Sequence, residues 1–142
     1  MITAIDTNIL LDILVPNEQF YETAAGALQE AAGEGSLVIS DIVYVELCVH
    51  FETQRDCDAF LDANEMRVQA LTREAHFLAS RVWRSYRRGG GKRTRVLADF
   101  LIGAHAQKQA TRLLTRDRGF YRTLFPSLNV QDPTEARNGK KR

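Results

Sequence analysis

Four acidic residues stand alone within or beside apolar segments of the chain: Asp6, Glu46, Asp99 and Asp117. No Lys or Arg lies three or four residues from Glu46, and only Arg95 has that spacing from Asp99. Local helical ion pairs therefore cannot neutralise the set. Because burying an unpaired carboxylate is expensive, the four acids need another explanation. If the fold brings them together, a hard divalent cation would remove their mutual repulsion.

That cation also suggests a reaction. Mg²⁺ and Mn²⁺ bind carboxylate and water oxygens and keep positions open for phosphate oxygens. One or two such ions can activate a water and stabilise the leaving oxygen of a phosphodiester. The three histidines are scattered along the chain, so metal-activated water is favoured over a side-chain base. For Asp6 taken alone, a helix cap is an equally good interpretation.

Short polar residues accompany the four acids, namely Thr7, Asn8, Ser40 and Thr115. They are suited to orient carboxylates or bound water around a metal. They are also helix-capping residue types, and for Ser40 the cap is the favoured interpretation, although both roles can coexist. Asp12 and Asp41 lie near the set too, and we interpret them as solvated or first-turn acids favoured by a helix dipole.

The elements that must position these residues alternate along the chain. Short apolar runs predict strands at 1–5, 37–39, 67–71, 112–115 and 128–131. Helical spacing and caps predict helices at 9–14, 18–32, 42–51, 54–63, 72–88, 96–108 and 119–125. This alternation predicts a single α/β domain over residues 1–135, with a parallel sheet of four to five strands and helices on both faces. Residues 136–142 are expected to form a basic tail.

Charge is divided unevenly between the two halves of the chain. Residues 1–71 hold 13 acidic and 2 basic residues, whereas residues 72–142 hold 17 basic and 5 acidic ones. This division suits an acidic site beside a surface for nucleic acid, although the halves could also neutralise each other. Clustered basic residues give salt-dependent affinity for a nucleic-acid backbone, and the alternative is a solvated helix end. The candidates are Arg87, Arg88, Lys92, Arg93, Arg95, Arg116 and Arg118.

Composition excludes several other classes of protein. The longest apolar runs are too short for a membrane span, and the first residues lack a basic, apolar leader, so a cytoplasmic location is expected. Cys48 and Cys57 do not match the spacing of a zinc site. The segment G-G-G-K-R-T at residues 89–94 does not match a phosphate-binding loop, because Lys92 is followed by Arg93.

Four segments together resemble the PIN-domain nucleases, and within them the VapC-type toxins of bacterial toxin–antitoxin pairs. The segments are I-D-T-N-I-L-L around Asp6, S-D-I-V-Y-V-E around Glu46, A-D-F-L-I-G-A-H-A around Asp99, and T-R-D-R-G-F around Asp117. The resemblance implies a parallel-sheet sandwich and an Mg²⁺- or Mn²⁺-dependent endoribonuclease. It further implies a homodimer and a small VapB-type antitoxin that covers the active-site groove. The family's three strongest acids map onto Asp6, Glu46 and Asp99, and a more variable fourth maps onto Asp117.

Other functions remain open at this point. A PIN domain could process RNA outside a toxin pair, or bind RNA or a protein partner without catalysis. A phosphatase with an aspartate nucleophile would need a second Asp where Asn8 stands. A receiver domain would need a Lys where Arg116 stands. The stretch from Arg87 to Arg95 is also longer and more basic than the resemblance leads us to expect.

Overall fold

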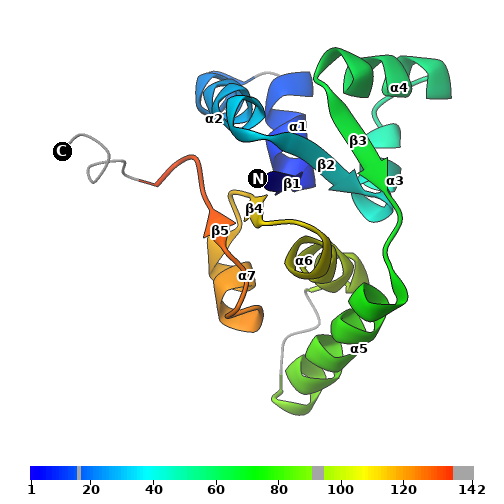
Figure 1. The fold of residues 1–142 in the computed structure, drawn as a ribbon, viewed down its shortest axis with the longest axis vertical. Coiled ribbons are helices and arrows are strands. Elements are labelled where there is room, and N and C mark those ends of the chain that lie inside the picture. Colours follow the sequence, from blue (N-terminus) through cyan, green and yellow to red (C-terminus); the bar gives the residue numbers. More distant parts are fainter. Residues whose placement is uncertain (16, 91–94, 136–142) are drawn as a thin grey trace.

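The computed structural model describes residues 1–15, 17–90 and 95–135, and these form a five-stranded parallel sheet with the strand order β3-β2-β1-β4-β5 (Figure 1). The strands are β1 (Ile2–Ile5), β2 (Ser36–Ser40), β3 (Met66–Gln69), β4 (Arg112–Leu114) and β5 (Val130–Gln131). The helices are α1 (Thr7–Leu14), α2 (Tyr21–Glu34), α3 (Asp41–Cys48), α4 (Gln54–Ala63), α5 (Arg73–Arg88), α6 (Leu97–Gln109) and α7 (Arg118–Leu124). The predicted fold class is confirmed.

The strand β1 lies at the centre of the sheet, and the chain adds strands first on one side of it and then on the other. The connections from β1 to β2 and on to β3 run toward one edge, whereas β3 to β4 crosses back and β4 to β5 continues toward the other edge. Crossovers between parallel strands are almost always right-handed, so connections that run in opposite directions lie on opposite faces. Helices α1 to α4 therefore cover one face, and α5 to α7 cover the other.

The central strands are apolar because they are covered on both faces. Ala4 of β1 pairs with Val38 of β2 on one side and with Leu113 of β4 on the other. All three side chains are buried. The carboxyl ends of β1 and β4 therefore lie side by side, and the residues that follow them, Asp6 and Thr115, are neighbours in space.

Polar caps set the first residues of several helices. The Ser40 hydroxyl accepts the Val43 amide at 3.1 Å, and Asp6 accepts the Thr7 amide at 2.8 Å. Asp6 directly follows β1 and Ser40 is the last residue of β2, so α1 and α3 both start at the same edge of the sheet. The sequence correctly indicates both starts, and with them the placement of Asp6 and Glu46 at one edge.

Several element boundaries differ from the sequence prediction, among them the end of α3, which is Cys48 and not residue 51. Helix α2 begins at Tyr21 because the Asn17 side chain accepts the Phe20 amide at 2.8 Å and forms a turn before the helix. Strand β3 ends at Gln69, since Gln109 bonds to the backbone of residues 70 and 72. Strand β5 begins at Val130, because the Leu128 amide is still bonded to Phe125.

In the described part of the chain, no helix is long and apolar enough to cross a membrane. The predicted basic tail at 136–142 lies outside the described residues, as do Lys92 and Arg93.

Candidate active site

Asp6 is the most enclosed of the four acids, with 6% of its surface exposed. It follows β1, and its carboxylate accepts the Thr7 amide at 2.8 Å and the Thr115 hydroxyl at 2.7 Å. The Asn8 amide lies 3.4 Å from the same carboxylate. The pKa of Asp6 is raised to about 6, mainly by burial and in smaller part by the charges of Glu46 and Asp99, while its hydrogen bonds from Thr115 and Thr7 lower it. Asp6 is therefore both a helix cap and a member of an acidic cluster.

Glu46 reaches Asp6 from the neighbouring strand–helix unit. It lies on α3, and its Oε1 accepts a short hydrogen bond from the Thr7 hydroxyl. Thr7 thus contacts two of the acids, Asp6 through its backbone amide and Glu46 through its side chain. This double contact fixes α1 and α3 relative to each other at the carboxyl edge of the sheet.

Asp99 and Asp117 complete the cluster from the other side of the sheet. Asp99 lies in the first turn of α6, and Asp117 precedes α7. Arg95 binds Asp117 through two contacts, at 2.6 and 3.2 Å, and lies 3.8 Å from Asp99. Burial raises the pKa of Asp99, and the charges of Asp117 and Glu46 raise it further, while Arg95 opposes the shift. The charges of the other acids thus act on Asp6 and Asp99, and the role of the four acids as metal ligands stays a prediction.

Thr115 joins three parts of this cluster. Its hydroxyl donates to Asp6 and accepts the Asn8 side-chain amide at 3.2 Å and the Asp117 backbone amide at 3.0 Å. The side-chain carbonyl oxygen of Asn8 in turn accepts a hydrogen bond from the Arg116 backbone amide at 3.2 Å. Thr7, Asn8 and Thr115 thus contact the acids, and their role around a metal stays a prediction. The hydrogen bond that Ser40 makes is the cap of α3, which is the interpretation the sequence favoured for it.

Tyr121 is a member of the site that the sequence interpretation missed. It is buried, with 1% of its surface exposed, and it lies on α7. Burial raises the pKa of Tyr121 well above its ordinary value, and the charges of Asp6, Asp99 and Asp117 and a hydrogen bond to Asp6 add to this shift. The available signal was its position four residues after Asp117, which is one helical turn.

The donor atoms of the cluster fit a hard divalent cation. They are carboxylate oxygens, and the repulsion among the acids is the kind that a bound cation relieves. Among residues 1–15, 17–90 and 95–135, no three His, Cys, Asp or Glu side chains form a ready metal site. In this structure Glu46 accepts a hydrogen bond from Thr7, and Asp117 is paired with Arg95. Residues to hold the ion are present, and their side chains must adjust to do so.

Three of the predicted RNA-binding arginines are engaged in ion pairs. Arg116 binds Asp12 at 2.7 Å, and Arg118 binds Asp132 at 2.6 Å. Arg95 binds Asp117, as described above. Asp12 is buried, which corrects its interpretation as a solvated acid: its helix faces Arg116, so the charge is neutralised inside the fold.

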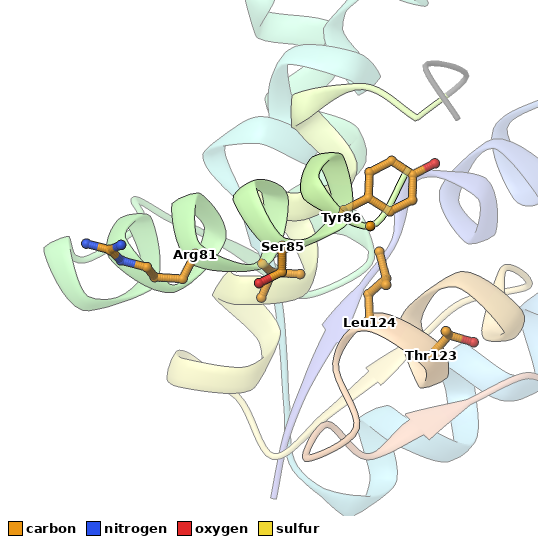
Figure 2. Close-up of a pocket in the computed structure, with 7 residues that line it drawn as sticks. Arg81, Ser85, Tyr86, Thr123 and Leu124 are labelled. Carbon is orange, nitrogen blue, oxygen red and sulfur yellow. The ribbon is translucent and has the colours of Figure 1, made fainter. Parts of the chain in front are cut away.

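Arg87 and Arg88 differ from the other arginines because both are exposed at the end of α5. The Arg87 guanidinium lies over the Trp83 ring at 5.2 Å from its centroid. A pocket of about 540 Å³ opens nearby, between α5 and the end of α7 (Figure 2). Its lining includes Arg81, Ser85 and Thr123, and none of the four acids, so it is separate from the acidic cluster.

Known proteins provide an independent comparison. The family model for the PIN domain matches residues 3–125 of the sequence, whereas no curated protein matches the chain in sequence. The fold is similar to VapBC2 from Rickettsia felis bound to a promoter DNA fragment, with a TM-score of 0.72, 21% identity, and coverage of 93% of this chain and 98% of that chain. It is also similar to VapBC-1 from nontypeable Haemophilus influenzae (TM-score 0.72, 19% identity, 95% and 100% coverage) and to FitAcB from Neisseria gonorrhoeae (0.70, 19%, 96% and 100%). The family model spans most of the chain, which therefore belongs to the PIN domain family.

Proposed function

We propose that this protein is a Mg²⁺- or Mn²⁺-dependent endoribonuclease and the toxin of a toxin–antitoxin pair. The observation that carries the proposal is the convergence of Asp6, Glu46, Asp99 and Asp117 at one edge of the sheet, with Asp6 buried among neutral donors and other acids. Membership of the PIN domain family, whose members are generally nucleases, supports it. The RNA substrate would place the protein in the cytoplasm.

In this proposal Asp6, Glu46 and Asp99 hold the divalent ion. When bound, the ion supplies an activated water and neutralises charge at the phosphodiester. Thr7, Asn8 and Thr115 keep the Asp6 carboxylate in one orientation through the bonds described above. Exposed basic residues at the end of α5, Arg87 and Arg88, attract the RNA backbone without reading its sequence.

The proposed partners follow from the solved structures with the same fold. Those structures are toxin–antitoxin and related complexes, including one described as a toxin–antitoxin complex from Klebsiella pneumoniae. We infer that a small VapB-type antitoxin covers the acidic groove of this chain and that the toxin forms a homodimer. An antitoxin segment that carries a cation would be complementary to the acids at the sheet edge.

RNA cleavage by the purified full chain tests this proposal. The wild-type protein should cut RNA when Mg²⁺ or Mn²⁺ is present and stop when EDTA is added. Asp6→Asn and Asp99→Asn should each lower the rate by about a hundredfold or more, because each removes a carboxylate that the ion needs.

Asp58→Asn is the matched control, since Asp58 lies on α4, accepts the hydroxyl of Tyr44 on α3, and makes none of the contacts described for the four acids. This variant should cut RNA at the wild-type rate. Circular dichroism should show the same helix content in all variants. Unchanged cleavage in Asp6→Asn and Asp99→Asn would refute the proposal, and RNA binding that is indifferent to EDTA without cleavage would favour a non-catalytic module.

A further inference from the structure

Arg95 extends its guanidinium into the acidic cluster from the residue pair that precedes α6. Two of its nitrogens lie 2.6 and 3.2 Å from the two carboxylate oxygens of Asp117. The same group lies 3.8 Å from Asp99 and 4.3 Å from the centroid of the Phe120 ring. A two-point contact with a carboxylate and a ring face fixes a guanidinium in one orientation.

The charge of Arg95 acts on one side of the cluster. It lowers the pKa of Asp99, and its hydrogen bond to Asp117 raises its own pKa. On the other side, Asp6 receives hydrogen bonds from neutral groups and is subject to the charges of Glu46 and Asp99. Among the residues that the structure describes, Arg95 is the cation that contacts Asp117 and approaches Asp99, and the negative charge around Asp6 is left for an ion from solution.

We propose that Arg95 is a built-in counter-ion that takes the place of a second metal at Asp117, so that the cluster binds one divalent ion through Asp6, Glu46 and Asp99. This inference rests on the proposed function and adds the number of ions and the role of the fourth acid. Asp117 is then a positioning residue: it holds Arg95 beside Asp99, and its backbone amide binds Thr115.

The geometry favours this division of roles. Arg95 approaches both oxygens of Asp117, so an ion bound there would have to displace the guanidinium or lie directly beside it. Like charges in such proximity repel strongly in a partly buried site. Asp6 and Glu46 have instead the hydroxyls and amides of Thr7, Asn8 and Thr115 around them, which add no positive charge.

Calorimetric titration of the metal-free full chain with MnCl₂ at pH 7 measures the number of ions directly. The wild type should bind one Mn²⁺ per chain, and Arg95→Ala should bind two, because removing the guanidinium leaves Asp117 without a cation. Arg95→Lys keeps the charge and should bind one. Asp117→Asn added to Arg95→Ala should remove the second ion.

Arg122→Ala is the matched control, because Arg122 makes a two-point contact with Glu135, at 2.8 Å in both cases, outside the cluster. It should bind one ion. Two ions in the wild type, or one ion at unchanged affinity in Arg95→Ala, would overturn the inference and leave the nuclease proposal standing. No ion in the wild type would overturn both. If Arg95→Ala does not fold, Arg95→Met gives the same readout.

Discussion

Asp6 and Asp12 are two buried aspartates at the two ends of one short helix, and their surroundings are opposite. Asp12 is 4% exposed and is bound by Arg116 at 2.7 and 3.0 Å. The Arg116 guanidinium also lies 3.9 Å from the centroid of the Phe20 ring. Asp6 has similar burial, but its hydrogen bonds come from neutral groups and its charged neighbours are acids.

This difference separates a carboxylate that stabilises the fold from one kept for a ligand. The chain neutralises Asp12 with its own guanidinium, so α1 and the segment after β4 are held together without any ligand. Among the described residues Asp6 has no ion pair, and its raised pKa records the free-energy cost of leaving it charged. Carboxylates that are destabilised in this way are typical of functional sites, because a bound cation can neutralise the charge.

The largest effect expected from this comparison is on the stability of the metal-free protein. The pKa of Asp6 is raised from 3.8 to about 6. At a pH between these two values, the folded state therefore keeps a proton on Asp6 that the unfolded state has lost. Stability contributed by this group therefore falls as pH rises from about 4 to 6 and stays low above that range. Asp6→Asn removes the penalty and should gain about 3 kcal/mol at pH 7 relative to wild type.

Urea unfolding in EDTA between pH 4.5 and 8 measures this gain. The difference between Asp6→Asn and wild type should shrink toward pH 4.5 and should shrink at pH 7 when Mn²⁺ is added, because the ion stabilises the wild type alone. A difference that stays constant with pH would contradict the comparison, as would an Asp6→Asn variant that is less stable at every pH.

A smaller and opposite effect is expected at Asp12. Asp12→Asn keeps the shape of the side chain and leaves Arg116 without its carboxylate, so the protein should lose about 2 kcal/mol. The loss should be the same with and without Mn²⁺, since the pair lies outside the cluster. Thermal or urea unfolding measures it, and a double-mutant cycle with Arg116→Met isolates the pair. A coupling energy near zero would show that Asp12 is not held by Arg116.

The sequence predicts the acidic cluster because burial and charge can both be read locally. Asp6 and Glu46 each stand in an apolar segment just past a strand or a cap, and a parallel sheet brings such positions to one edge. Capping residues such as Ser40 give the helix starts in the same way. The fold and these helix starts could be predicted because each depends on a few neighbouring residues and on the alternation of strands and helices.

The partners of the charged residues could not be predicted, because they depend on contacts across the fold. Arg116 and Asp12 are separated by 104 positions, and the residues around either one give no indication that the two side chains pair. Arg95 has the spacing of a helical partner for Asp99, yet its shorter contact is with Asp117, 22 positions away. Helical periodicity shows which face is buried and not which side chain from another element meets it.

The smallest expected effect concerns Thr115, which supports Asp6 without contributing a charge. Thr115→Val removes the hydroxyl that donates to Asp6 and accepts from Asn8 and Asp117. The variant should lose about 1 kcal/mol at pH 7. The Thr115 hydrogen bond lowers the pKa of Asp6, so its loss should move that pKa above its wild-type value of about 6. Urea unfolding as a function of pH gives both quantities.

Thr123→Val, at an exposed position of α7, is the control and should change neither the stability nor the pKa of Asp6. If Thr115→Val lost stability with no rise in the pKa of Asp6, the hydroxyl would only stabilise the fold. The pKa of Asp6 would then be set by burial and by the charges of the other acids.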